Sequence, residues 1–193
     1  IVATRDAGIK RFVYAASSST YGDSESLPKI EEVIGKPLSP YAITKYVGEL
    51  YADVFSKTYG VECIGLRYFN VFGKKQDPAG AYAAVIPKFT DLLINKKSPT
   101  INGDGSYSRD FTYIDDIVEG TLETLCLSST KNRTFNIGSG LPIKLNSFIS
   151  KIEDELGIKA NLELTKMQLG DVKRTFAGIN ELKTKINYNP KTS

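Results

Sequence analysis

The sequence predicts an α/β protein built on a parallel, doubly wound sheet. Two short apolar runs, residues 10–16 (KRFVYAA) and 61–68 (VECIGLRY), have the composition of strands buried in a parallel sheet. Between them, residues 41–58 have a helical pattern that Gly60 ends. Strand, helix and strand with short connections form the unit of a doubly wound sheet. The helix is expected to carry an apolar stripe of Val47, Leu50, Val54 and Phe55.

The start of this helix presents a phenol and an ammonium on one face. Ser39 can cap the helix with its hydroxyl, and Pro40 suits the first turn. Tyr41 and Lys45 are four residues apart, so they are neighbours on the helix surface. The cation and the positive end of the helix dipole both favour a phenolate, which could act as a general base. A single Tyr-x-x-x-Lys also occurs by chance, so this interpretation needs support from elsewhere in the chain.

Composition narrows the chemistry. The 193 residues include no histidine, which excludes His-based triads and leaves acid/base work to Tyr, Lys or carboxylate. Cys63 and Cys126 form neither a disulfide framework nor a metal-binding spacing, so we expect no metal and a cytoplasmic location. The net charge of +3 is spread without long runs, and no apolar run could span a bilayer. We therefore expect neither nucleic acid nor membrane as a partner.

Polar residues follow both predicted strands. Ser17 to Asp23 (SSSTYGD) follow the first, and residues 69–73 (FNVFG) follow the second. In an open α/β sheet, the ligand crevice lies outside the carboxyl ends of the strands. The hydroxyl cluster is well placed to bind substrate oxygens, although Ser, Gly and Asp are also common in ordinary strand-to-loop turns.

The rest of the chain continues the alternation of helices and strands. Asp115 or Asp116 is expected to cap a helix that runs to about residue 127. Gly138-Ser139-Gly140 lacks a third glycine and a following helix start, so we reject it as a dinucleotide loop. The other expected elements are the end of a helix at 1–8, a loop at 27–38, a helix at about 83–95, a strand and turn at 100–105, a β-prone segment at 109–114, a strand at 134–137, a helix at 145–156, an edge strand at 161–165 and an irregular basic segment from 166.

Six stretches of the chain together resemble one family. They are SSSTYGD (17–23), SPYAITK (39–45), RYFNVFG (67–73), AAVIPKF (83–89), INGDGSYSRDF (101–111) and FNIGSG (135–140). On these stretches the sequence is similar to the extended short-chain dehydrogenase/reductases, within them to the UDP-sugar 4-epimerases, and most closely to the bacterial UDP-N-acetylglucosamine 4-epimerases. The resemblance implies part of a Rossmann-type doubly wound parallel sheet plus a smaller α/β substrate-binding domain. The first would comprise residues 1–73 with parts of 105–140, and the second residues 74–104 and 141–193.

The resemblance also implies roles for individual residues. Tyr41 would take the proton of the sugar 4-hydroxyl, Lys45 would hold the nicotinamide ribose of NAD, and Ser17 would share the proton's hydrogen bond. Tyr68 and Phe69 would flank the nicotinamide. The residues implied in UDP-sugar binding are Ser18, Ser19, Asn70, Ala84, Val85, Ile101, Asn102, Arg109, Asp171 and Thr175. A homodimer is implied through the helix at 41–59.

The sequence departs from the family pattern in two ways. The glycine-rich dinucleotide loop of the family is absent, so we expect a C-terminal fragment that is inactive by itself. Gln168 occupies a position where the family usually has an arginine, whose role is either lost or taken by Lys166, Lys173 or Arg174.

Three alternatives concern the reaction and the sugar. Dehydratases and decarboxylases of the same family resemble patterns with a carboxylate where this chain has Ser18 and Ser19, which favours epimerisation. A non-catalytic binding protein would not need Ser17, Tyr41 and Lys45 together. Thr175 replaces a bulky Tyr of family members confined to glucose and galactose, so we expect room for an N-acetyl group unless Phe176 fills the space.

Overall fold

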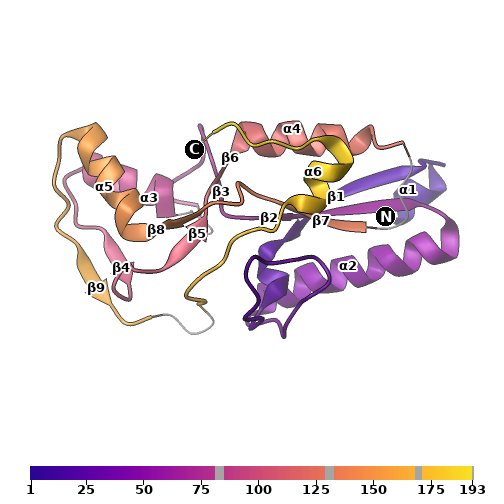
Figure 1. Cartoon of the computed structure of the whole chain (residues 1–193), viewed down its shortest axis with the longest axis horizontal. Coiled ribbons are helices and arrows are strands. Elements are labelled where there is room, and N and C mark those ends of the chain that lie inside the picture. The colour runs from indigo at the N-terminus through magenta and orange to yellow at the C-terminus, as the bar shows by residue number, and fades with distance from the viewer. Residues whose placement is uncertain (81–84, 129–132, 168–170, 193) are drawn as a thin grey trace.

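The computed structural model describes residues 1–80, 85–128, 133–167 and 171–192. Within them, a parallel three-stranded sheet has the order β1 (Arg11–Ser17), β2 (Glu62–Tyr68), β7 (Arg133–Ile137). The long helix α2 (Pro40–Tyr59) covers one face of this sheet, and α4 (Ile114–Leu125) covers the other (Figure 1). This arrangement confirms the predicted doubly wound α/β unit.

The strand register brings the carboxyl ends of the sheet together. Ser17 pairs with Tyr68, and Tyr68 pairs with Ile137, the last residues of the three strands. The chain leaves β1 through a short 3-10 helix, η1 (Ser18–Tyr21). The hydroxyl cluster after β1 and the residues after β2 therefore lie at one edge, as the sequence predicts.

Helix α2 begins and ends at the predicted signals, but its apolar stripe faces outward. The Ser39 hydroxyl accepts a hydrogen bond from the Ala42 N–H at 3.1 Å, and Gly60 ends the helix at a φ of 70°. Small Ala52 is buried against the sheet, which lets the helix approach closely. The predicted stripe is instead exposed, with fractions of 39% for Val47, 49% for Leu50 and 56% for Val54.

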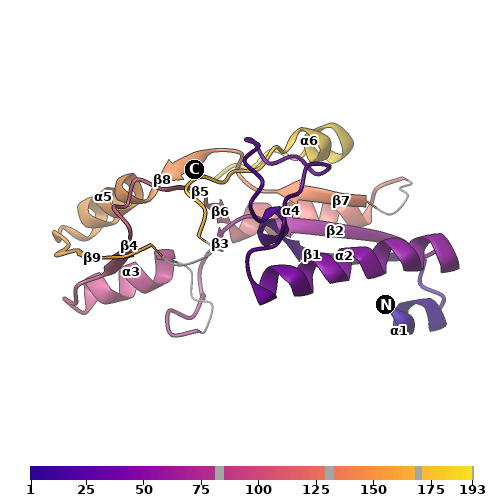
Figure 2. The ribbon, with the colours of Figure 1, turned by 90° about the horizontal axis from the view of Figure 1, so that it is seen from below.

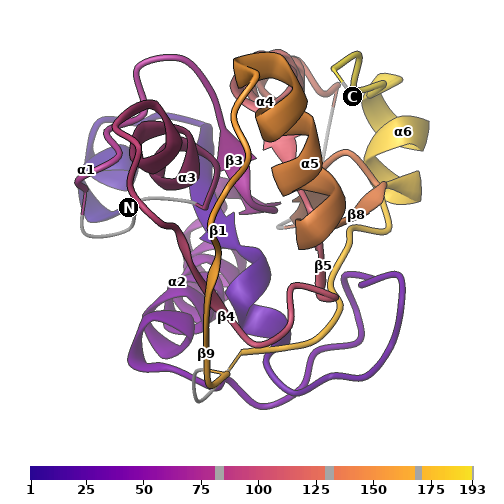
Figure 3. The same cartoon turned by 90° about the vertical axis from the view of Figure 1, so that its left-hand side faces the viewer.

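A second group of elements lies beyond the carboxyl edge of the sheet (Figure 1) and stands nearest the viewer in Figure 3. Strand β4 (Thr100–Asn102) pairs in parallel with β9 (Glu163–Thr165), and β5 (Ser108–Asp110) pairs antiparallel with β8 (Pro142–Lys144). Helices α3 (Val85–Ile94) and α5 (Leu145–Leu156) pack on β4 through Phe89, Ile101 and Ile149. The short parallel pair β3 (Val71–Phe72) and β6 (Thr112–Tyr113) connects this group to the sheet.

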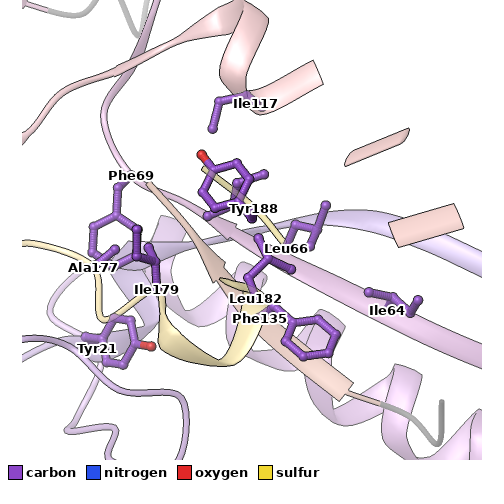
Figure 4. Packing of buried hydrophobic residues seen from close by; sticks show 11 residues of the cluster. Tyr21, Ile64, Leu66, Phe69, Ile117, Phe135, Ala177, Ile179, Leu182 and Tyr188 are labelled. Atoms are coloured by element: carbon purple, nitrogen blue, oxygen red, sulfur yellow. The ribbon is translucent and has the colours of Figure 1, made fainter. Parts of the chain in front are cut away.

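The end of the described chain returns to the sheet. Helix α6 (Asn180–Ile186), which the sequence patterns did not predict, packs against β7 and α4 (Figures 1 and 2). Its neighbours Ala177 and Tyr188 are buried in the main core with Tyr21, Phe69 and the sheet residues (Figure 4). Part of the segment expected in the substrate domain therefore stabilises the sheet. A short helix, α1 (Val2–Asp6), precedes β1.

The predicted aspartate cap of α4 is wrong. The residue before the helix is Tyr113, and no side chain caps the helix. Asp116 lies in the first turn and accepts hydrogen bonds from the backbone N–H groups of Lys191 at 2.8 Å and Thr192 at 3.1 Å. The carboxylate therefore holds the end of the chain against α4.

Among the residues that the structure describes, no helix is long and apolar enough to cross a bilayer.

Candidate active site

In the described part of the chain, two cavities meet at the carboxyl edge of the sheet. The smaller has a volume of about 200 Å³ and the larger about 370 Å³. Asn70, Arg109 and Asp171 line both of them. An extended ligand could therefore place one end in each cavity, and its middle would then lie beside these three residues.

The smaller cavity is lined by the predicted hydroxyl cluster. The Ser17 hydroxyl oxygen accepts hydrogen bonds from the Ser19 N–H at 3.2 Å and from the Ser19 hydroxyl at 2.9 Å. Ser17, Ser18 and Ser19 all line the cavity, together with Ser39 at the start of α2. These groups can both donate to and accept from the hydroxyls of a sugar.

Tyr41 and Lys45 lie together beside this cavity. The Lys45 ammonium nitrogen is 5.7 Å from the centre of the Tyr41 ring and donates a hydrogen bond to the Ala15 carbonyl at 3.0 Å. The bond to β1 fixes the ammonium at the edge of the sheet. Tyr41 is 44% exposed and lies between Ser39 and Ala42, which both line the cavity. The structure thus brings Ser17, Tyr41 and Lys45 to one region.

Tyr68 and Phe69, which the resemblance places beside the nicotinamide, lie at and just after the end of β2. The Phe69 ring is completely buried in the core, with its centre 6.1 Å from that of the Tyr21 ring. A ring enclosed on all sides cannot flank a nicotinamide, so the side-chain role predicted for Phe69 is not supported. The Tyr68 hydroxyl lies 3.5 Å from the Thr121 hydroxyl on α4, and Tyr68 lines neither cavity.

Arg109 occupies the junction of the cavities. Its Nη2 donates to Asp171 Oδ1 at 3.1 Å, and its Nη1 donates to the Ser108 carbonyl at 3.0 Å. The Arg109 side chain is 19% exposed, so the remaining donors of the guanidinium stay accessible to a ligand. Asn70 lies two residues after the end of β2 and has a backbone φ of 24°. A guanidinium and an amide at this point suit phosphate oxygens.

The larger cavity contains the predicted residues of the uridine side. Val85, Ile101 and Asn102 line it. Ala84 and Gln168 lie outside the described residues. Lys166, Lys173 and Arg174, the candidates to replace an arginine at 168, line neither cavity in the structure.

Thr175 lines the smaller cavity, and Phe176 does not. Thr175 is only 9% exposed, and its N–H donates to the Ser108 carbonyl at 3.3 Å. This backbone bond fixes the small side chain in the cavity wall.

Three polar lining residues are among those that sequence analysis missed. Tyr107 and Lys88 line the larger cavity, and Lys29 lines the smaller. Tyr107 precedes Arg109 by two residues, so strand alternation could have placed both on one face. The Tyr107 ring also packs over Gly103, where an added Cβ would lie 2.3 Å from a ring carbon. Lys29 gave no signal, because a lysine in a loop is usually solvated.

The groups present suit one part of a dinucleotide. The Lys45 ammonium and the Tyr41 hydroxyl are appropriate partners for ribose hydroxyls. The turn at Gly138 to Gly140, which sequence analysis rejects as a dinucleotide loop, binds a carboxylate instead. The N–H groups of Ser139 and Gly140 donate to the buried Asp110 carboxylate at 2.8 and 3.0 Å. The described residues therefore fit the nicotinamide-ribose end, and Gly138 to Gly140 do not supply a pyrophosphate loop.

Comparisons with known proteins agree with this geometry. A UDP-glucuronate 4-epimerase of Thermodesulfobacterium geofontis is 38% identical over 191 residues, which cover 98% of this chain and 57% of the relative. The UDP-N-acetylglucosamine 4-epimerase of Methanobrevibacter ruminantium M1, solved with UDP-N-acetylmuramic acid, is 36% identical with a TM-score of 0.92, covering 98% of this chain and 60% of that one. The UDP-glucuronic acid 4-epimerase of Bacillus cereus, solved with UDP-glucuronic acid and NAD, is 33% identical with a TM-score of 0.91, covering 100% of this chain and 60% of that one.

The chain thus spans under two thirds of the length of these relatives. Residues 1–138 match the model of the NAD dependent epimerase/dehydratase family. The predicted Rossmann-type class and the resemblance to UDP-sugar 4-epimerases are confirmed by these matches. On the evidence of its fold, its site and these relatives, the chain belongs to the NAD-dependent epimerase/dehydratase family.

Proposed function

We propose that this chain is the C-terminal part of an NAD-dependent UDP-sugar 4-epimerase that interconverts UDP-N-acetylglucosamine and UDP-N-acetylgalactosamine. The observation that carries the proposal is the placement of Ser17, Tyr41 and Lys45 beside a polar cavity that joins a second one at Arg109. A UDP-sugar has the matching shape, with a diphosphate between its nucleoside and its sugar.

The reaction needs a proton acceptor at the sugar 4-hydroxyl. NAD, when bound, supplies a reversible hydride acceptor for C4 and gives a transient 4-keto sugar. Tyr41 takes the hydroxyl proton and later returns it to the ketone oxygen. Lys45 binds the ribose, and Ser17 donates a hydrogen bond to the same sugar oxygen. Return of the hydride to the opposite face of C4 would invert that centre, and because every proton and hydride is returned, the reaction needs no net oxidant.

The lining residues favour epimerisation over the related reactions. Of the described residues that line the two cavities, the one carboxylate is Asp171, and it is paired with Arg109. Ser18 and Ser19 stand where the resemblance puts the carboxylates of dehydratases and decarboxylases. A dehydratase or decarboxylase of the same family is therefore the weaker candidate.

The sugar assignment rests on Thr175. Its small, buried side chain in the wall of the smaller cavity leaves room for a substituent such as an acetamido group. The hydroxyls of Ser18 and Ser19 can bond the amide, and a site built to bond a polar group discriminates against sugars that lack it.

We also propose that the enzyme forms a homodimer through α2. Among the large apolar side chains of this helix, five that follow helical spacing along one strip are between 39% and 61% exposed in the described chain. An exposed apolar strip along a helix is typical of a surface that another subunit covers. These residues are Ile43, Val47, Leu50, Tyr51 and Val54.

The test is conversion of UDP-N-acetylglucosamine by the full-length polypeptide that contains this chain, supplied with NAD and followed by proton NMR of the anomeric signals. The proposal predicts an equilibrium mixture with the galacto epimer. If no UDP-hexose or UDP-hexosamine is epimerised, the proposal is wrong.

A further inference from the structure

Lys29 is a buried lysine held beside the wall that carries Thr175. Only 3% of its surface is exposed. Its N–H donates to the Phe176 carbonyl at 2.9 Å, and its carbonyl accepts from the Gly178 N–H at 2.7 Å and from Asn136 Nδ2 at 2.8 Å. These bonds join the loop between η1 and α2 to the segment that follows Thr175. The position of Lys29 is therefore fixed by its backbone, independently of its ammonium group.

The Lys29 ammonium is largely unpaired. Within the described residues, its one hydrogen-bond acceptor is the Ser24 carbonyl, and no carboxylate lies within ion-pair distance. An ammonium has three donors, so two remain for another partner. Burial without a counter-ion is unfavourable for a cation, and it lowers the pKa of Lys29. By contrast, the buried Arg67 guanidinium forms an ion pair with the Glu49 carboxylate, with 2.7 Å between Nη2 and Oε2.

Lys29 belongs to the sugar side of the site. It lines the smaller cavity with the three serines and Thr175, and it is not among the residues that line the larger one. Arg109 lines both cavities and is neutralised by Asp171. Lys29 is thus the cation of the smaller cavity that has no carboxylate beside it in the described chain.

We propose that Lys29 is a specificity-determining residue whose ammonium binds an oxygen acceptor on a substituent of the hexose, either the carbonyl of an acetamido group or a carboxylate. This inference rests on the proposed function, because it takes the smaller cavity as the sugar site. Carbonyl and carboxylate oxygens are stronger hydrogen-bond acceptors than the hydroxyl groups of glucose. The ammonium should therefore bind a sugar that carries one of these groups more tightly than it binds glucose.

The experiment measures binding by calorimetry to the NAD-loaded full-length polypeptide. The ligands are UDP, UDP-glucose, UDP-N-acetylglucosamine and UDP-glucuronate. The proteins are wild type, Lys29→Met, Lys29→Gln and the control Lys36→Met, which removes an exposed ammonium from the same loop. We expect Lys29→Met and Lys29→Gln to reduce the preference for one acceptor-bearing sugar over UDP-glucose by about tenfold or more, with the affinity for UDP unchanged. The control should leave every affinity unchanged.

The two sugars identify the source of the acceptor. A selective loss for UDP-N-acetylglucosamine assigns Lys29 to the acetamide, and a selective loss for UDP-glucuronate assigns it to the carboxylate. An equal loss for all four ligands would overturn the proposal, because Lys29 would then serve the diphosphate or the loop. A wild type that prefers neither acceptor-bearing sugar over UDP-glucose would also overturn it, even if the variants do not fold. Binding without turnover would refute the epimerase assignment but leave this test intact.

Discussion

Arg109 and Asp171 form an ion pair at the junction of the two cavities, with 3.1 Å between Nη2 and Oδ1. Both residues line both cavities, so the pair stands where a ligand would pass from one to the other. The carboxylate orients the guanidinium before a ligand arrives, and the free donors remain for phosphate oxygens. This arrangement makes Arg109 a binding residue in our account, with no part in proton transfer.

Arg109→Lys is therefore expected to raise KM about tenfold to a hundredfold with a much smaller change in kcat. A lysine keeps the charge but cannot form the two-pronged contact with phosphate oxygens. Steady-state kinetics on the full-length polypeptide checks the split between the two constants. The matched control is Arg133→Lys, because Arg133 forms an exposed pair with Glu181 and lines neither cavity. A fall in kcat at constant KM would contradict the assigned role.

Thr175→Tyr is expected to abolish the preference for N-acetylated sugars. The larger ring would take the space beside the sugar and exclude the acetamido group, while UDP-glucose would still fit. The measurement is kcat/KM for both sugar pairs in wild type and variant, with Thr184→Tyr on the exposed face of α6 as the control. Equal values for the two pairs in wild type would refute the preference. Unchanged turnover of the N-acetylated pair in the variant would remove Thr175 as its cause.

A charge on the exposed face of α2 should separate the proposed dimer. Leu50→Glu places a carboxylate in the middle of the apolar strip, where burial against a second subunit would be costly. Light scattering after gel filtration should show a dimer for wild type and a monomer for the variant. Leu122→Glu is the control, since Leu122 on α4 is similarly exposed at 57%. A Leu50→Glu protein that remains dimeric would place the interface elsewhere.

The 193-residue chain by itself is expected not to retain NAD. A bound dinucleotide normally places its pyrophosphate on a glycine turn and helix N-terminus, and the turn at Gly138 to Gly140 cannot serve because the N–H groups of Ser139 and Gly140 bind Asp110. Calorimetric titration of the purified chain with NAD should give no measurable heat of binding. Tight, stoichiometric binding would show that the described residues suffice.

Local signals in the sequence predicted much of the fold. The apolar runs and the capping residues Ser39 and Gly60 act within a few residues, so β1, β2 and α2 could be placed before the structure was known. The edge that brings Ser17 and Asn70 to one cavity followed from the general rule for parallel sheets. Asn70, Asp171 and Thr175, which the resemblance implies in substrate binding, line one cavity in the structure.

The remaining features depend on contacts between distant segments. Helix α6 has no capping side chain and is held by packing on β7, so its short sequence carries little signal. Asp116 binds the backbone of residues 191 and 192 instead of capping α4. Phe69 directly follows β2, and Tyr21 and the returning segment enclose its ring in the core. Burial of Lys29 likewise arises from segments far away in the sequence.

The most direct test of the central claim is Tyr41→Phe in the full-length polypeptide. The change removes a proton-transfer group worth about 10² to 10⁴ in rate and leaves the ring in place. Tyr51→Phe on the same helix is the control, and Ser17→Ala should have a milder effect because Ser17 only shares the hydrogen bond. We predict that Tyr41→Phe lowers the kcat for epimerisation of UDP-N-acetylglucosamine at least about a hundredfold, while the affinity for the UDP-sugar changes by only a few-fold. Retention of substantial turnover by Tyr41→Phe would contradict the account.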